Sequence, residues 1–173
     1  MRPDEIKQLV RDIPDFPKPG VMFHDITPLI ANPRGLAAVV DQLAEPFLGK
    51  VDMVLGIESR GFIIGAPVAY RLGVGLAIAR KPGKLPFHTV DEVYELEYGN
   101  ATLQIHQDGL HGNRRILIVD DLLATGGTAR AAGRLTERLG GEVAGYAFVI
   151  ELRALGGRER LAPASYQALI HYD

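Results

Sequence analysis

The chain has 173 residues, of which 47% are hydrophobic and 23% charged, so it can bury the core of one ordinary domain. A formal net charge of −2 provides no overall attraction for nucleic acid or a membrane surface, and the lack of cysteine excludes disulfides and thiol chemistry. The start of the chain has no apolar signal segment, and no later run is long enough to span a bilayer. We therefore expect a single cytoplasmic domain over residues 1–173.

Residues 1–32 are predicted to form an N-terminal arm outside the main sheet. A short amphipathic helix is expected over residues 4–12, because apolar residues recur there at helical spacing and Pro14 follows. The proline-rich segment after it cannot join a sheet regularly, so it should wrap the surface or cover a site. Phe23 is an aromatic side chain that can stack on a flat base, although such residues more often lie in a core.

From Asn32 onward, helical and strand patterns alternate, which is typical of an α/β fold with a mostly parallel sheet. Asn32 followed by Pro33 is a favourable helix start. Short apolar runs without polar alternation predict strands buried on both faces. In chain order, strands are predicted at 51–57, 74–79, 101–106, 116–119, 143–150 and 168–171. Helices are expected after the first of these, ending near Leu72, and after the fourth, from about Ala129.

The segment from Ile116 to Thr128 carries the strongest functional signal. A buried strand ends there in Asp120 and Asp121, at the edge where α/β sheets bind ligands. We expect the two carboxylates to turn toward one crevice. Residues 124–128 then supply backbone N–H groups, two glycines and two threonine hydroxyls at the start of a helix. A phosphate is the ligand that such a turn favours.

A ribose phosphate fits this pattern, because sugar hydroxyls donate to carboxylates while the phosphate lies on the turn. An acidic pair at a strand end more often caps a helix or faces solvent, but here it coincides with the buried strand and the glycine-rich turn. The Walker A pattern and the dinucleotide fingerprint are both missing. The five histidines show no paired spacing for a structural metal.

The run from Val119 to Thr128 resembles the phosphoribosyl pyrophosphate (PRPP) motif of type I phosphoribosyltransferases, in the form found in members of that family that act on adenine. Further similar segments lie at 16–20, 23–28, 58–62, 80–86 and 96–99. The resemblance implies a central, mostly parallel sheet flanked by helices, an N-terminal arm that contributes to the base pocket, and a flexible lid hairpin at residues 85–100.

The resemblance also implies roles for individual residues. The catalytic residues would be Glu97, Asp120 and Asp121, with Glu97 handling the purine proton and Tyr98 at the base of the lid. PRPP and ribose 5-phosphate would bind Asp120, Asp121, Leu123, Ala124, Thr125, Gly126, Gly127 and Thr128. Pyrophosphate would bind Ser59, Arg60, Arg80 and Lys84, and adenine would bind Met22, Phe23, His24 and Leu152.

Further expectations concern the basic residues, one peptide bond and His24. Arg80 and Lys84 are assigned because a highly charged substrate needs a cationic wall beside an acidic pair. The family often has a cis peptide at the position of Glu58–Ser59. It more usually has arginine where this chain has His24, so the contribution of that side chain is open.

The implied reaction transfers 5-phosphoribose from PRPP to N9 of adenine and releases AMP and pyrophosphate. Mg²⁺ would be held mainly through the substrate, with Asp120 or Asp121 as the available protein ligands. The strand at 143–151 has no lysine or arginine of the kind that related enzymes use for 6-oxopurines, which favours adenine. The family implies a homodimer, and no nucleic-acid or membrane partner is expected.

Two alternatives remain open from the sequence. A regulator with the same fold would bind PRPP or a purine and act on nucleic acid without catalysis. We expect no such role, because the chain begins near the N-terminus of the family, leaves no room for a DNA-binding domain and retains Glu97 and Tyr98. The second alternative keeps the enzyme but changes the base to xanthine or a modified 6-aminopurine.

Overall fold

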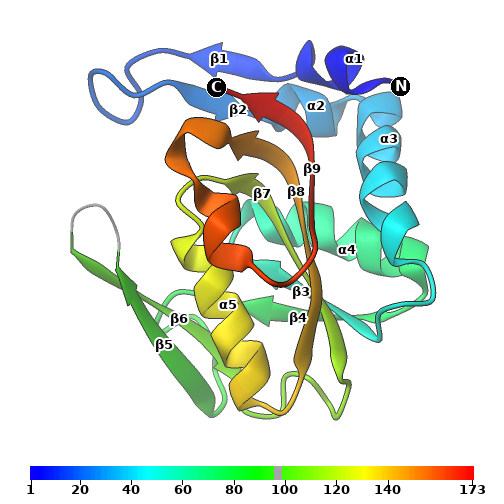
Figure 1. Cartoon of the computed structure of the whole chain (residues 1–173), viewed down its shortest axis with the longest axis vertical. Helices are drawn as coiled ribbons and strands as arrows, with labels where there is room; N and C mark the ends of the chain where they lie inside the picture. The colour runs from blue at the N-terminus through cyan, green and yellow to red at the C-terminus, as the bar shows by residue number, and fades with distance from the viewer. Residues whose placement is uncertain (96–98) are drawn as a thin grey trace.

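The structure is a computed structural model that describes residues 1–95 and 99–173. The predicted catalytic residue Glu97 and the lid residue Tyr98 lie outside the described residues. The central layer is a five-stranded sheet in the order β4-β3-β7-β8-β9, and each neighbouring pair of strands is parallel. Helices cover both faces of this sheet (Figure 1), which confirms the predicted α/β fold class.

The strands of the central sheet are β3 (Met53–Ile57), β4 (Gly75–Ala79), β7 (Arg115–Leu123), β8 (Glu142–Leu152) and β9 (Tyr166–Tyr172). The covering helices are α3 (Pro33–Ala44), α4 (Arg60–Leu72) and α5 (Gly127–Arg138). A separate antiparallel hairpin consists of β5 (Thr89–Glu95) and β6 (Asn100–His106). The N-terminal arm consists of α1 (Pro3–Lys7), β1 (Arg11–Ile13), β2 (Phe23–Asp25) and α2 (Thr27–Ala31). Short 3₁₀ turns lie at η1 (Glu45–Phe47), η2 (Arg153–Leu155) and η3 (Gly157–Leu161).

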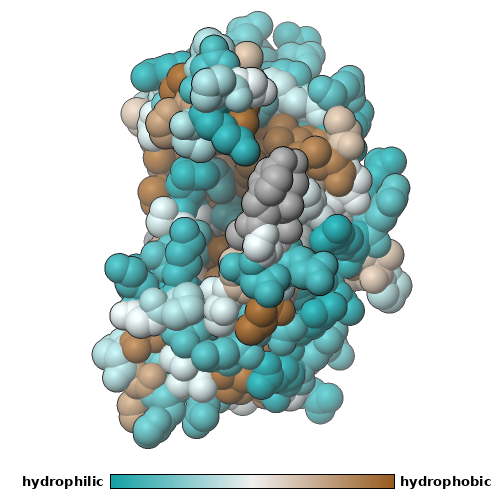
Figure 2. Space-filling model, turned by 90° about the vertical axis from the view of Figure 1, so that its left-hand side faces the viewer, coloured by the Kyte–Doolittle hydropathy of each residue, from teal (hydrophilic) through white to brown (hydrophobic). Residues whose placement is uncertain are grey.

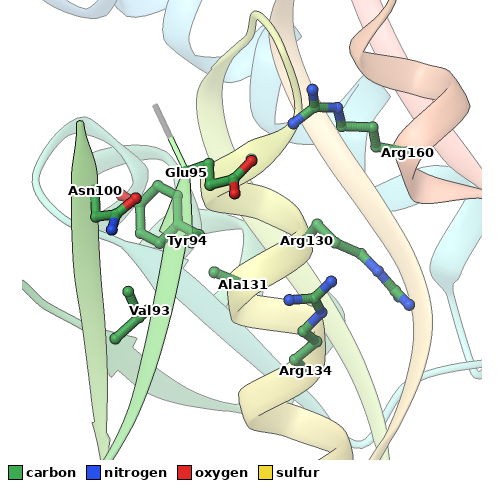
Figure 3. Close-up of a pocket in the computed structure, with 9 residues that line it drawn as sticks. Val93, Tyr94, Glu95, Asn100, Arg130, Ala131, Arg134 and Arg160 are labelled. Carbon is green, nitrogen blue, oxygen red and sulfur yellow. The ribbon is translucent and has the colours of Figure 1, made fainter. Parts of the chain in front are cut away.

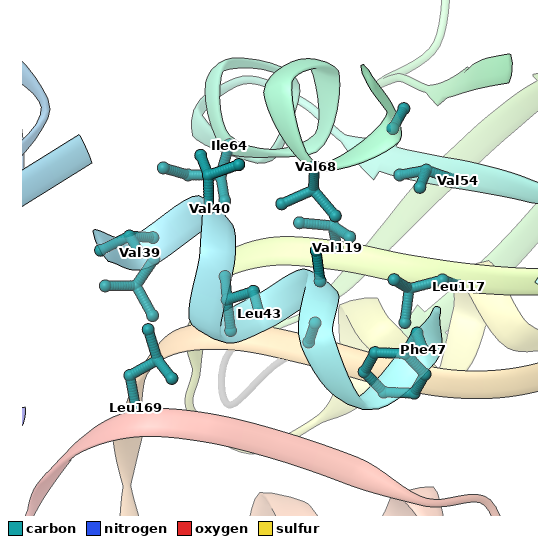
Figure 4. Packing of buried hydrophobic residues seen from close by; sticks show 14 of the residues in the cluster. Val39, Val40, Leu43, Phe47, Val54, Ile64, Val68, Leu117, Val119 and Leu169 are labelled. Carbon is teal, nitrogen blue, oxygen red and sulfur yellow. The ribbon is translucent and has the colours of Figure 1, made fainter. Parts of the chain in front are cut away.

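The apolar run of β7 is uninterrupted because the strand is buried between two layers of helices. Leu117 and Val119 belong to the core cluster with α3 and α4, as Figure 4 shows. Ile116 and Ile118 belong to a second cluster with α5. Alternate side chains of a strand point to opposite faces, so both clusters hold the same strand. The C-terminal end of β7 is therefore a rigid platform.

The N-terminal arm differs from the prediction in one element. The helix expected over 4–12 ends at Lys7, and residues 11–13 form β1, which pairs antiparallel with β2. Pairing with β2 satisfies the backbone hydrogen-bonding groups of residues 11–13, which a longer helix would have satisfied within itself. Ile6 of α1 and Leu29 of α2 are fully buried in the same cluster as α3, which holds the arm over the carboxyl ends of the strands (Figure 1).

β7 also extends further than predicted, through Asp120 and Asp121 to Leu123. The strand continues because its pairing with β8 continues as far as Glu151. The acidic pair is therefore held on a hydrogen-bonded strand and not on a loop. Within the described ranges, no helix is long and apolar enough to cross a membrane.

Candidate active site

The predicted phosphate loop joins β7 to α5 at the carboxyl edge of the sheet. Gly126 precedes the helix with a φ of 79°, a conformation that glycine adopts without strain. The first N–H groups of α5 have no partner within the helix, and the helix dipole adds positive potential there. The hydroxyl of Thr128 donates to the hydroxyl of Tyr94 over 3.3 Å, which connects this turn to the hairpin. The local geometry suits an anion, and the phosphate that the sequence pattern predicts there stays a prediction.

Gly157, in η3, supports the phosphate loop from the side. A Cβ atom on Gly157 would lie 2.1 Å from the carbonyl oxygen of Ala124, and one on Gly126 would lie 2.5 Å from the carbonyl oxygen of Gly157. The two backbones therefore touch with no space for a side chain. From the sequence alone, the glycine pair before Arg158 is interpreted only as a break in the chain. No local pattern indicates that Gly157 contacts Ala124 and Gly126.

Asp121 and Arg60 join β7 to the start of α4. Asp121 is only 6% exposed, and its Oδ2 accepts a hydrogen bond from Nε of Arg60. The guanidinium of Arg60 also lies over the ring of Phe23, 5.5 Å from its centroid. Arg60 thus links the acidic pair to the predicted base-stacking residue. The Glu58–Ser59 peptide just before it is cis, which confirms the expectation drawn from the family.

Asp120 has different surroundings from its neighbour. Burial, followed by the negative charge of Asp121, raises the pKa of the Asp120 carboxyl well above its ordinary value. One oxygen of Asp120 accepts a hydrogen bond from the backbone N–H of Asp121 at 2.9 Å, which partly offsets that rise. A carboxylate in such a place is stabilised by any positive charge that develops nearby.

Arg80, at the end of β4, is held by Glu58 at the end of β3. Nε and Nη2 of Arg80 each lie 3.2 Å from an oxygen of the Glu58 carboxylate. The backbone N–H of Lys81 donates to the same carboxylate at 2.9 Å. Burial opposes ionisation of Glu58, but these donors lower its pKa on balance. Arg80 thus has its guanidinium on Glu58, the residue before Ser59, and the side chain of Lys84 is exposed.

The residues predicted to bind adenine come from the N-terminal arm and the end of β8: Met22, Phe23, His24 and Leu152. Phe23 meets Phe16 edge to face, with 5.1 Å between ring centroids. The ring of His24 is engaged elsewhere: its Nδ1 lies 2.6 Å from an oxygen of Asp12, and it stacks on Tyr172 at 3.7 Å. His24 therefore fastens the arm to β9. Leu152 is partly buried and Met22 is half exposed.

Comparison with known proteins identifies the family. Residues 22–168 match the sequence profile of the phosphoribosyl transferase domain. A relative from Koribacter versatilis, an adenine phosphoribosyltransferase, is 56% identical over 171 residues, which is 98% of this chain and 94% of the relative. The chain belongs to the adenine phosphoribosyltransferase family.

Two solved structures of adenine phosphoribosyltransferases extend this similarity to three dimensions. The enzyme from Thermoanaerobacter pseudethanolicus has a TM-score of 0.94 and 48% identity, with 98% of this chain and 99% of that chain covered. The enzyme from Saccharomyces cerevisiae has a TM-score of 0.89 and 38% identity, over 96% of this chain and 97% of that chain. It was crystallised with D-2,5-dideoxy-2,5-imino-altritol 1,6-bisphosphate and adenine.

The carboxylates of this site limit how a metal could be held. Among the described residues, no group of three or more His, Asp or Glu side chains is placed to hold a metal ion. Asp121 is already paired with Arg60, and Asp120 is its immediate neighbour. This donor set fits a cation such as Mg²⁺ that takes most of its ligands from substrate oxygens and water.

A cavity of about 600 Å³ lies beside this site, between β5 and α5 (Figure 3). Its lining is Val93, Tyr94, Glu95, Asn100, Gly127, Arg130, Ala131, Arg134 and Arg160. Two of the arginines have anionic partners, since Arg134 pairs with Glu92 at 3.0 Å and Arg130 with Glu137 at 3.8 Å. The cavity meets the phosphate loop at Gly127. Figure 2 shows the face of the molecule on the hairpin side, which is mostly hydrophilic with hydrophobic patches in its upper part.

Proposed function

We propose that this chain transfers the 5-phosphoribosyl group of PRPP to N9 of adenine and releases AMP and pyrophosphate, a reaction of purine salvage. The main support for this proposal is the turn from β7 to α5, which holds the acidic pair and the proposed phosphate loop next to each other. The relatives named adenine phosphoribosyltransferase support the same reaction.

In this proposal the backbone of residues 124–128 and the hydroxyls of Thr125 and Thr128 hold the 5-phosphate. Anchoring the phosphate fixes the anomeric carbon of the ribose relative to the base. Asp120 and Asp121 accept hydrogen bonds from the ribose hydroxyls, with Leu123 closing the end of the strand. When pyrophosphate departs, positive charge develops on the ribose ring and the acidic pair stabilises it.

The pyrophosphate lies against Ser59, Arg60, Arg80 and Lys84 in this proposal. These residues follow β3 and β4, which are adjacent parallel strands, so they share the carboxyl edge of the sheet. In this proposal the guanidinium of Arg80 is shared between Glu58, which holds its Nε and Nη2, and the substrate. Mg²⁺ would be held mainly through the substrate, with Asp120 or Asp121 as the available protein ligands, and would supply positive charge that offsets the charge of the pyrophosphate.

The base lies between the N-terminal arm and the end of β8. Phe23 stacks on the purine, Leu152 and Met22 supply apolar contact, and His24 contributes through its backbone because its ring is held by Asp12 and Tyr172. Residues 142–152 contain no lysine or arginine that could donate to a 6-oxo group. Adenine, which has a 6-amino group, is therefore the favoured base.

Glu97 and Tyr98 keep their proposed roles as the group that handles the purine proton and as part of a lid at residues 85–100. Replacement of Glu97 by Gln tests the first role. A fall in turnover with unchanged PRPP affinity supports proton handling, whereas a loss of affinity alone assigns Glu97 to the lid.

The proposed assembly is a homodimer in the cytoplasm. Apolar side chains are exposed on α4 and the edge strand β4, where Ile63 is 47%, Tyr70 89% and Leu76 37% exposed. Burial of such a face in a second copy would remove apolar surface from water. Sedimentation or light scattering should give twice the chain mass, and Tyr70→Glu should shift the mass toward the monomer. A monomeric wild-type protein would contradict the dimer.

The decisive experiment measures AMP formed from adenine, PRPP and Mg²⁺, with hypoxanthine, guanine and xanthine in parallel. Adenine-selective turnover that requires Mg²⁺ is expected. Comparable use of a 6-oxopurine would refute the proposed base pocket. Saturable PRPP binding without turnover on any base would favour the regulatory alternative.

A further inference from the structure

The β5 strand of the hairpin is attached to α5, the helix that begins at the phosphate loop. The carboxylate of Glu92 pairs with Arg134 at 3.0 Å and with Arg138 at 3.3 Å. Arg138 also donates to the carbonyl oxygen of Asp91. These contacts align the strand with the helix over more than one turn. The next residue of β5 that faces the helix is Tyr94.

Tyr94 meets the first turn of α5. Its hydroxyl accepts a hydrogen bond from Oγ1 of Thr128 at 3.3 Å. Its ring lies beside Gly127, where an added Cβ atom would be 3.5 Å from Cδ2 of the tyrosine, an ordinary contact distance. The ring also packs against the core cluster that contains Ala131 and Leu135 of the same helix. The position of the Tyr94 hydroxyl is therefore set by packing on several sides.

From this geometry we propose that Tyr94 is a positioning residue that orients the hydroxyl of Thr128 toward the 5-phosphate of PRPP. The inference deepens the proposed function and rests on it. A hydroxyl group both donates and accepts. Thr128 donates to Tyr94 in the structure, but with a phosphate present Tyr94 can donate to Thr128, which leaves the threonine hydrogen for a phosphate oxygen. Tyr94 acts through Thr128 without touching the substrate.

The first test is Tyr94→Phe, which removes only the hydroxyl. The KM for PRPP should rise about three- to tenfold, as expected for one weakened hydrogen bond. The turnover at saturating PRPP should change less than twofold, because the 5-phosphate is bound equally in the ground and transition states. The KM for adenine should stay constant. Tyr166→Phe is the matched control, since Tyr166 is a partly buried tyrosine of the same core cluster whose hydroxyl interacts with Arg158.

A double-mutant cycle with Thr128→Val separates positioning from a general structural role. If Tyr94 acts through Thr128, Tyr94→Phe should have no further effect on PRPP affinity in the Thr128→Val background. Additive effects of the two substitutions would overturn the proposal. A lower melting temperature of Tyr94→Phe with unchanged PRPP affinity would overturn it as well, because that result is the mark of packing alone.

PRPP binding should also be measured by calorimetry without adenine, so that the inference and the proposed function can fail separately. Weaker PRPP binding by Tyr94→Phe, lost in the Thr128→Val background, supports the inference even where no AMP is made. Normal AMP synthesis with equal PRPP binding by wild type and Tyr94→Phe retains the proposed function and refutes the role of Tyr94.

Discussion

The two sides of the site are built in different ways. On the side proposed to bind the 5-phosphate (the phosphate side), the turn between β7 and α5 is shaped by backbone contacts, with Gly126 against Gly157. On the side proposed to bind pyrophosphate (the pyrophosphate side), long side chains reach between segments: Arg60 meets Asp121, 61 residues away, and Arg80 meets Glu58. The phosphate side is therefore rigid and has no space for added atoms, whereas the pyrophosphate side is a set of ion pairs that substrates can rearrange.

The largest effect should come from adding one carbon to the phosphate side. Gly157→Ala places a Cβ atom 2.1 Å from the carbonyl oxygen of Ala124, so the loop must move. We expect the KM for PRPP to rise more than about tenfold and the free energy of unfolding to fall by about 2 kcal/mol, as is usual for overpacking. Steady-state kinetics and chemical denaturation measure the two effects.

Gly65→Ala is the control, because the nearest atoms to its Cβ would lie 3.5 Å away, an ordinary contact distance. It should leave PRPP affinity unchanged. If Gly157→Ala behaved in the same way, the phosphate side would be more adaptable than its backbone contacts indicate.

The next largest effect should come from Asp120→Asn, which we expect to lower turnover by about 100-fold, the usual cost of one lost electrostatic contact to a transition state. The same substitution should raise stability at neutral pH. Burial and the charge of Asp121 raise the pKa of Asp120 in the folded state, so folding disfavours its ionised form. The melting temperature then reports this cost directly.

The pH dependence has a defined sign. Between the ordinary pKa of 3.8 and the raised folded value, the folded protein binds more protons at Asp120 than the unfolded chain does. This group therefore makes wild-type stability fall as pH rises through that interval, and the Asn variant should lack that contribution. A stability advantage of Asp120→Asn that did not shrink toward acidic pH would contradict the raised pKa.

Asp121→Asn should lower turnover too, but with the opposite effect on stability. It removes the charged partner of Arg60, whose side chain is 40% exposed, so we expect a loss of about 1 kcal/mol in unfolding free energy. Equilibrium denaturation of both variants at neutral pH gives the comparison. Equal shifts for Asp120→Asn and Asp121→Asn would show that the two carboxylates share one environment.

The smallest effect should come from the pyrophosphate side. Glu58→Gln weakens the hold on Arg80, and product inhibition by pyrophosphate should tighten by about threefold, in line with the modest strength of partly exposed ion pairs. Asp52→Asn, which breaks the ion pair with Arg115 at the other end of the sheet, is the control and should not alter it. Weaker pyrophosphate inhibition in Glu58→Gln would indicate that Glu58 orients Arg80 for the ligand.

The phosphate side could be predicted from the sequence because its signals are local. A buried strand, two aspartates, a glycine-rich turn and a helix follow one another from Ile116, and the structure places them as β7 and α5. The strand extends through the aspartates because β8 continues to pair with it. No local sequence pattern predicts this pairing. Gly157 supports the phosphate loop through a contact with residues more than 30 positions earlier in the chain. The sequence around Gly157 gives no signal of that contact.

The side-chain partners on the pyrophosphate side could not be predicted either, because they too are distant in the sequence. Nothing near Arg60 or Arg80 in the sequence specifies Asp121 or Glu58 as its partner. His24 is a similar case: the family resemblance assigns it to the base pocket and leaves its side chain open, and in the structure its ring contacts Asp12 and Tyr172. The pattern of strands and helices predicts that these residues share one edge of the sheet. Their individual contacts depend on tertiary packing, which the pattern does not specify.

The fastening of the N-terminal arm to β9 has a consequence for how the protein is made. Nζ of Lys7 donates to the carbonyl oxygen of His171, 164 residues along the chain, and the ring of His24 stacks on Tyr172. During synthesis the arm leaves the ribosome early, but its partner strand follows much later. Contacts of such long sequence separation form slowly. We expect the base side of the site to be the part of the nascent protein that a chaperone meets in an open state.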